Sequence, residues 1–245
     1  MHRFFVSPDQ ISQRFVRFDD DQAHQMRRVL RLRPGDRVLA LDGLGNQYEV
    51  TLEEVSHARV TGSASVAAAA TGEPSARLTL YQSILRREKF EWVLQKGTEI
   101  GIAAFIPVIT RRSLVRDAED VRPEKLDRWR RIIKEAAEQS GRGRLPALHP
   151  PISFSEACLE ARAADLALFA WEGEARRTLR EALTARAAAR HLALFIGPEG
   201  GYDPAEVSEA EAWGAIPVSL GRRTLRTETA AVVSAALVLY ELGEL

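Results

Sequence analysis

Residues 194–206, LFIGPEGGYDPAE, lead from a strand through a glycine-rich turn into a helix. The apolar run Leu192–Ile196 does not alternate with polar residues, which is typical of a strand covered on both faces. Short apolar runs and longer helical stretches alternate in this way from Arg77 to the end of the chain. Strands are expected at 78–84, 104–109, 166–170 and 216–220, and helices at 89–100, 123–139, 204–213 and 227–242. This alternation predicts an α/β fold around a mostly parallel sheet.

The first 70 residues have a different pattern. Turn signals at 34–36, 42–43 and 45–46 separate short stretches that favour β-structure. Strands are expected at 14–18, 37–41, 47–54 and 58–65, with a short helix at 22–30. The small, turn-prone stretch 67–74, AAAATGEP, is the expected linker. We therefore expect a β-rich domain at 1–70 and an α/β domain at 75–245.

Composition limits the classes of function. The formal net charge of the 245 residues is zero, which argues against nucleic-acid binding by bulk charge alone, but 71–150 hold sixteen basic against eleven acidic residues. The single cysteine, Cys158, excludes an intramolecular disulfide and a multi-cysteine metal site. No apolar run reaches the roughly 18 to 20 residues that span a bilayer, and the N-terminus lacks the apolar core of a signal peptide. A soluble cytoplasmic protein is the expectation.

Three loops follow the carboxyl ends of expected strands, where parallel sheets bind ligands. They are 171–173, 197–201 and 221–226. The glycine turn at 197–201 lacks both the G-x-G-x-x-G pattern and a following Gly-Lys-Ser/Thr, so it is neither a dinucleotide fingerprint nor a P-loop. Asp203 is the expected N-cap of the next helix, with Glu206 completing a capping box. By itself this segment fits an ordinary strand-to-helix turn.

The last loop places charge against an apolar helix. Arg226 and Glu228 abut a helix that is apolar on nearly every side, with Thr227 as its expected N-cap. Charges buried there need partners or a ligand, which favours a binding site over a solvated turn. The helix at 227–242 fits either a central core helix or a subunit interface.

Two motifs together resemble a known class. GPEGG at 197–201, followed by LGRRTLRTETA at 220–230, resembles the SPOUT class of methyltransferases. The chain is more narrowly similar to the bacterial 16S ribosomal RNA uridine-N3 methyltransferase family. The stretches that carry this narrower likeness are MHRFF at 1–5, His24 with RRVLR at 27–31, QKGTEIG at 95–101 and EAAEQSGR at 135–142. The likeness covers nearly the whole chain.

The resemblance implies a fold and an activity. It implies a SPOUT domain with a C-terminal trefoil knot, preceded by a PUA-like β-barrel that helps to hold RNA. It also implies a homodimer with the last helix in the interface. S-adenosylmethionine would donate a methyl group to uracil N3 in the decoding region of the 30S subunit, leaving S-adenosylhomocysteine, without a metal.

The candidate site residues fall into three groups. Those expected to take part in the chemistry are Arg226, Glu228 and Glu199, with Glu138 as a further candidate base and Arg142 as a further anion-stabilising group. An ion pair that orients Arg226 is the favoured interpretation of Glu228. Those expected to bind the cofactor are Phe169, Trp171, Ile196, Gly197, Pro198, Glu199, Gly200, Gly201, Leu220, Gly221, Arg222, Leu225, Arg226, Thr229 and Ala230. Those expected to contact RNA are Arg3, His24, Arg27, Arg28, Arg86, Arg87, Lys89, Arg111, Arg112, Arg116 and Arg142.

Two other functions fit the same patterns. One is a SPOUT ribose 2′-O-methyltransferase acting on transfer or ribosomal RNA. The other is a non-catalytic RNA-binding factor for ribosome assembly that retains the fold. A nucleotide-dependent hydrolase is disfavoured because the phosphate-binding motif is missing.

Overall fold

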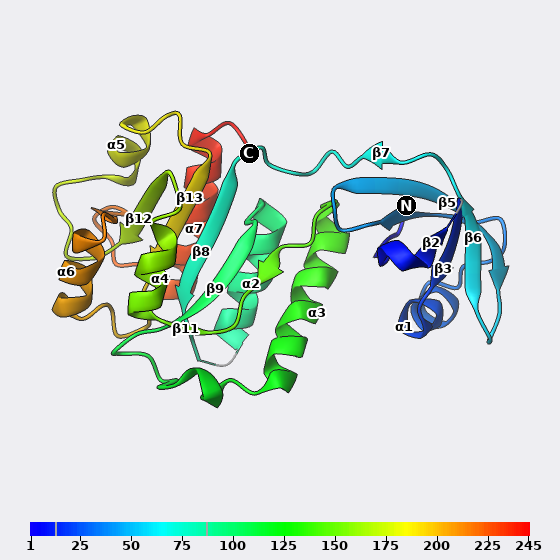
Figure 1. Cartoon of the computed structure of the whole chain (residues 1–245), viewed down its shortest axis with the longest axis horizontal. Coiled ribbons are helices and arrows are strands. Elements are labelled where there is room, and N and C mark those ends of the chain that lie inside the picture. Colours follow the sequence, from blue (N-terminus) through cyan, green and yellow to red (C-terminus); the bar gives the residue numbers. More distant parts are fainter. Residues whose placement is uncertain (13, 87) are drawn as a thin grey trace. The chain divides into compact units, whose positions relative to one another are not determined.

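The computed structural model describes residues 1–12, 14–86 and 88–245, which form two compact units (Figure 1). The first unit contains Met1–Glu73 and Ala137–Leu145; the second contains Pro74–Ala136 and Pro146–Leu245. The linker at 67–74 was expected to separate two continuous domains. The structure instead pairs part of it, strand β7 (Ala68–Ala69), with strand β5 (Asn46–Val55), and places 137–145 with the first unit.

A largely antiparallel sheet forms the first unit. Its order is β1-β4-β5-β6-β3-β2, and among the described residues this path stays open. The bounds are β1 (Arg3–Phe5), β2 (Ile11–Ser12), β3 (Phe15–Phe18), β4 (Arg37–Leu41), β5 (Asn46–Val55) and β6 (Val60–Ala64). The expected strands at 14–18, 37–41, 47–54 and 58–65 are therefore found. The pairing of β1 with β4 is parallel and was missed, because three residues give no period.

The expected helix at 22–30 is divided. Asp19 caps α1 (Asp20–His24), and one π-type turn, Gln25–Val29, continues it. Met26 faces the core of the sheet, whereas Val29 is 67% exposed. A π-type turn changes the helical period, which is why the 3.6-residue pattern did not reveal the break.

The last turn of α3 (Pro123–Ser140) belongs to the first unit. Ala137 packs against Phe5 and Leu41, and Glu138 accepts a hydrogen bond from the Phe5 amide at 2.9 Å. Arg142 is 3% exposed, and its guanidinium pairs with Glu73 at 2.9 Å. Glu138 and Arg142 thus hold the segment 137–145 to the sheet. These contacts favour a structural role for both side chains over the predicted RNA contact or anion-stabilising role of Arg142 and the predicted role of Glu138 as a base, which stay predictions.

A parallel sheet forms the centre of the second unit. Its order is β10-β9-β8-β13-β12-β14, with β11 also paired to β9, and every pairing is parallel. The bounds are β8 (Arg77–Ser83), β9 (Ala104–Ile109), β10 (Ala147–Leu148), β11 (Ile152–Ser153), β12 (Leu166–Ala170), β13 (His191–Ile196) and β14 (Ile216–Val218). The mostly parallel sheet predicted from the apolar runs is confirmed.

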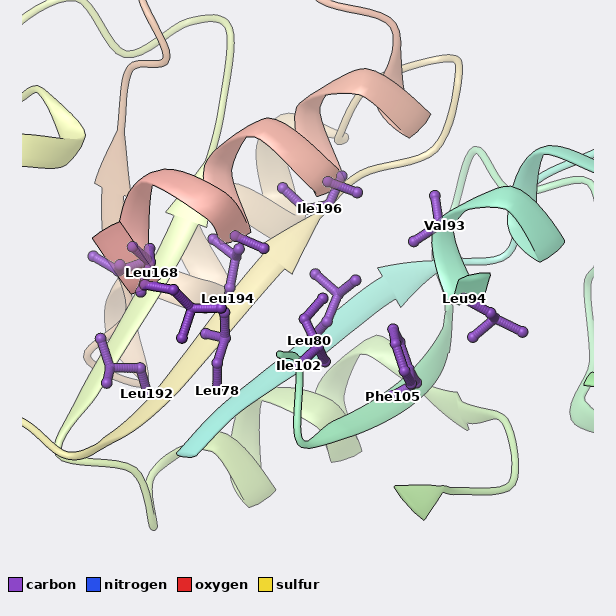
Figure 2. Close-up of a cluster of buried hydrophobic side chains, with 14 of the residues drawn as sticks. Leu78, Leu80, Val93, Leu94, Ile102, Phe105, Leu168, Leu192, Leu194 and Ile196 are labelled. Atoms are coloured by element: carbon purple, nitrogen blue, oxygen red, sulfur yellow. The ribbon is translucent and has the colours of Figure 1, made fainter. Parts of the chain in front are cut away.

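Helices cover both faces of this sheet. One face packs against α2 (Glu88–Ile100), α3, α5 (Leu179–Thr184) and α7 (Thr227–Glu241). Figure 2 shows leucines of β8, β12 and β13 in this core, together with Val93 and Leu94 of α2. The other face packs against α4 (Phe154–Ala161) and α6 (Pro204–Ala212). Helix α7 buries Ala231, Ala235 and Leu239 in the first of these cores, so the core-helix interpretation holds for one side of it.

Two features are absent from the described residues. No helix among them combines the length and apolarity that a membrane crossing needs. They contain no group of three or more His, Cys, Asp or Glu side chains placed to hold a metal ion.

Candidate functional site: a cavity at the carboxyl ends of three strands

The three loops that follow β12, β13 and β14 enclose one cavity of about 540 Å³. Parallel pairing brings the carboxyl ends of these strands to one edge of the sheet, as the sequence predicts. The lining residues are Lys89, Ala170, Trp171, Glu172, Ile196, Gly197, Pro198, Glu199, Gly200, Gly201, Tyr202, Ser219, Leu220, Gly221, Arg222, Arg223, Thr224, Leu225, Arg226, Thr227, Glu228 and Ala230. The volume lies within the range of small-molecule sites, about 300 to 1,000 Å³.

Glycine is required at two positions of this lining for different reasons. Gly201 has a φ of 66°, in the left-handed region, and its amide donates to the Pro198 carbonyl at 3.0 Å. A Cβ at Gly197 would lie 2.9 Å from the ring of Tyr202. Burial raises the pKa of Tyr202 well above its ordinary value, so its hydroxyl stays neutral beneath the loop. The loop backbone therefore lies close to the cavity, where a ligand can contact it.

The start of α6 is built as predicted. Asp203 accepts from the Ala205 amide at 3.1 Å, and Glu206 accepts from the Asp203 amide at 2.9 Å. The second carboxylate oxygen of Glu206 accepts from the Arg111 amide at 2.8 Å. The capping box thus also joins the glycine loop to the loop after β9.

The start of α7 differs from the prediction by one residue. Arg226 is the N-cap, and Thr227 is the first helical residue. The Thr227 hydroxyl donates to the Gly197 carbonyl at 2.5 Å, so it joins the last loop to the glycine loop instead of capping the helix. A buried amide of Gln82 lies 3.4 Å from the same hydroxyl.

An ammonium group lies between two carboxylates at the cavity wall. Lys89 Nζ is 3.5 Å from Glu199 Oε1 and 3.5 Å from Glu228 Oε2. Lys89, in the first turn of α2, lines the cavity, and its predicted contact with RNA stays a prediction. Among the residues that the structure describes, Glu228 forms an ion pair with Lys89 and none with Arg226, which differs from the predicted pairing.

The candidate cofactor residues are nearly all brought together. Two of them do not line the cavity. Phe169 is 1% exposed, and its ring packs against that of Tyr202 with the centroids 4.1 Å apart. It lies in the core beneath α4 and α6, on the other face of the sheet, because successive side chains of β12 point to opposite faces. Thr229 lies one residue beyond Glu228 on α7 and is half-buried. Sequence reasoning missed Lys89 as a lining residue, together with Ala170, Glu172, Tyr202, Ser219, Arg223, Thr224 and Thr227, most of which are neighbours of predicted ones.

The candidate RNA contacts have varied surroundings. In the first unit, His24 and Arg28 are exposed and Arg3 is half-buried, while Arg27 contacts His57 at 2.7 Å. In the second unit, Arg86 and Arg116 are exposed, whereas Arg111 and Arg112 both lie within ion-pair distance of Asp203. Arg112 also donates to the Gly200 carbonyl at 3.1 Å. Arg87 lies outside the described residues.

Comparison with known protein families identifies the class of protein to which the chain belongs. An RNA methyltransferase domain model matches residues 72–239, and an RNA methyltransferase PUA domain model matches residues 18–63. The chain is thus an RNA methyltransferase with a PUA domain, and the predicted α/β domain and PUA-like β-unit are confirmed. The trefoil knot stays a prediction.

The relatives narrow this class to one family. The chain is 34% identical to ribosomal RNA small subunit methyltransferase E of Synechocystis, over 97% of this chain and 77% of the relative. It is 29% identical to the protein of that name from Bacillus subtilis, over 90% and 88% of the two chains. The chain belongs to the ribosomal RNA small subunit methyltransferase E family.

Solved structures agree with this assignment. The methyltransferase E of Neisseria gonorrhoeae, solved with S-adenosylmethionine, superposes with a TM-score of 0.87 at 30% identity, covering 98% of this chain and 97% of that one. A methyltransferase of Legionella pneumophila, also solved with S-adenosylmethionine, gives a TM-score of 0.88 at 28% identity, covering 97% and 96%.

Proposed function

We propose that this protein transfers the methyl group of S-adenosylmethionine to N3 of a uridine in the decoding region of 16S ribosomal RNA, in the 30S subunit. The observation that carries the proposal is the cavity of about 540 Å³ at the carboxyl ends of β12, β13 and β14. The small-subunit specificity comes from the names of the relatives. Such an enzyme acts where bacterial ribosomes are, so we propose that it works in the cytoplasm.

The cavity fits this cofactor in its chemistry. Four lining residues of the loops 197–201 and 219–226 are glycines, which have no side chain, so their amide and carbonyl groups can meet an adenine. The Glu199 carboxylate suits the positive sulfonium and amino groups. When bound, the cofactor supplies an activated methyl group, so this chain's residues need to bind, orient and remove a proton.

Target recognition is proposed for exposed basic side chains of both units. The exposed side chains of His24 and Arg28 in the first unit, and of Arg86 and Arg116 in the second, are the best placed to meet phosphates. Replacing several of them should flatten the salt dependence of RNA affinity, since each phosphate contact releases counterions.

A homodimer through α7 is part of the same proposal. Val233, Leu237 and Tyr240 repeat at helical spacing and are 39%, 43% and 64% exposed, opposite the buried face of the helix. An apolar stripe on a helix is typical of an interface with a second copy. Leu237→Glu should give monomers by sedimentation, whereas Leu159→Glu, at an exposed leucine of α4, should leave dimers intact. Dimers of both variants would contradict the α7 interface.

The experiment that tests the activity is methylation of unmodified 30S subunits with labelled cofactor. Nucleoside mass spectrometry of the product should show N3-methyluridine at one position of 16S RNA. A ribose 2′-O-methyl nucleoside would support the alternative SPOUT activity. No transfer together with RNA binding would support a non-catalytic assembly factor.

A further inference from the structure

Lys89, Glu199 and Glu228 meet at the cavity wall, and the two carboxylates have different surroundings. Glu199 accepts from the Arg86 amide at 3.3 Å in addition to its ion pair with Lys89. Glu228 is more enclosed, with 16% of its side chain exposed. Its buried Oε2 lies 3.5 Å from Lys89 but accepts no hydrogen bond from any residue that the structure describes. Glu199 is therefore positioned by a hydrogen bond and an ion pair within the protein, whereas Glu228 Oε2 can still accept a hydrogen bond.

A buried carboxylate oxygen without a hydrogen bond destabilises the folded protein, because it has lost its water partners without replacement. Native proteins keep such groups rarely, and often for a functional reason. Here the carboxylate lines the cavity, so a ligand that carries a hydrogen-bond donor can satisfy it. This points to a donor group on the substrate.

The hydrogen-bonding edge of uracil matches the charges around Glu228. Its imide edge presents an acceptor at O2, a donor at N3–H and an acceptor at O4, and a complementary site presents donor, acceptor and donor. Lys89 and Arg226 supply donors and Glu228 an acceptor, and all three line the one cavity. Cytosine has an acceptor at N3, so it would leave Glu228 without a donor.

We propose that Lys89, Glu228 and Arg226 recognise the imide edge of the target uracil and that Glu228 accepts the N3 proton; this rests on the proposed function. The N3–H bond breaks and its proton moves to the Glu228 carboxylate. The electron pair left on N3 forms the bond to the methyl carbon, and the pair of the broken carbon–sulfur bond stays on sulfur. Lys89 and Arg226 stabilise the negative charge that develops on O4 and O2 as the proton leaves.

Variants of Lys89 distinguish a role in the chemical step from a contact with an RNA phosphate. Single-turnover methylation of unmodified 30S subunits, with enzyme and cofactor saturating, reports on the chemical step. Lys89→Met should lower this rate by about 100-fold, the usual effect of removing one donor to a developing charge. Lys89→Arg keeps a cationic donor and should retain most of the rate. Glu228→Gln should lower the rate by about 100-fold or more, through loss of the proton acceptor.

The controls separate chemistry from structure. Lys96 lies on the same helix and pairs with Glu99 at 2.8 Å outside the cavity lining, so Lys96→Met should methylate at the wild-type rate. The Kd of S-adenosylmethionine, measured by calorimetry, should change less than about tenfold in the Lys89 variants. A wild-type rate for Lys89→Met at saturation, with weaker subunit binding and a flatter salt dependence, would overturn the inference and make Lys89 a phosphate contact.

Two other results would count against the donor role of Lys89 or against the proposed function, and they can be told apart. Equal losses in Lys89→Met and Lys89→Arg would overturn the donor role, because the arginine variant keeps the charge. If the wild-type product is not N3-methyluridine, the proposed function fails. If the product is N3-methyluridine and Lys89→Met is as fast as wild type, this inference alone fails.

Discussion

Replacing Gly197 with alanine tests whether the glycine loop depends on its close contact with the ring of Tyr202. The added Cβ would lie 2.9 Å and 3.0 Å from two ring carbons of Tyr202, closer than real Cβ contacts. The ring cannot retreat easily, because it stacks on Phe169 at 4.1 Å and packs against Phe154 at 5.7 Å. Either the ring or the loop must shift, and both form the cavity wall.

The expected magnitude follows from two opposing effects. Overpacking of a closely packed site costs about 1 to 3 kcal/mol. An alanine in place of glycine also reduces the entropy of the unfolded chain, which returns about 0.4 to 1 kcal/mol. The net loss in the free energy of unfolding is therefore about 1 to 2 kcal/mol, or roughly 2 to 8 °C in Tm for a chain of this size. A comparable disturbance of the cavity wall should weaken S-adenosylmethionine binding by about tenfold.

The matched control lies three residues further along the same loop. At Gly200 the nearest atom to an added Cβ is 3.4 Å away, and the backbone is outside the left-handed region. Gly200→Ala should therefore unfold close to wild type. Tm is measured by circular dichroism and the cofactor Kd by calorimetry. The reasoning is refuted if Gly197→Ala matches Gly200→Ala in both, because the Tyr202 contact would then carry no cost.

Three further results are expected. Arg142→Met should lower the free energy of unfolding in urea by about 2 kcal/mol or more, because it removes the cation that pairs with the Glu73 carboxylate and leaves the Arg144 amide as a donor to it. The folded Arg142→Met variant should keep its RNA affinity, whereas Arg28→Met, at an exposed side chain, should weaken RNA binding and leave the stability unchanged. Burial raises the pKa of Cys158 to about 12, so iodoacetamide at pH 8 should modify it only after unfolding in guanidinium, as mass spectrometry would show; rapid modification of the folded protein contradicts this. Chelation with EDTA should leave single-turnover methylation of 30S subunits unchanged, and a loss that added metal restores would contradict a metal-free reaction.

The central strands and the amphipathic helices could be predicted from the sequence, because burial of a strand or helix face requires an unbroken or periodic apolar pattern. Leu166–Ala170 and Ala104–Ile109 have the predicted bounds. Helices α4 and α5 were missed, although each begins with a capping box, Ser153 with Glu156 and Thr178 with Glu181, that could have revealed it. Strands β10 and β11 have two residues each and form through pairing with β9, and two residues are too few to show a strand pattern in the sequence.

The loops of the site could be predicted, but the side chains that meet across them could not. The motif spacing placed 197–201 and 220–230 at one edge of the sheet. Lys89 reaches Glu199 and Glu228 because β8, which leads to α2, lies beside β13 in the sheet, and this order is a tertiary property. Arg142 shows the converse, since an arginine in a basic stretch can be buried and paired within the protein.

The central claim is that the cavity between the three loops holds the methyl donor. A crystal structure of the full chain with S-adenosylhomocysteine tests it most directly. The account predicts density for the ligand between the loops 171–173, 197–201 and 219–226, in contact with their backbone. Density elsewhere, such as in the cavity of about 170 Å³ beside Trp213, with these loops left empty, would contradict it.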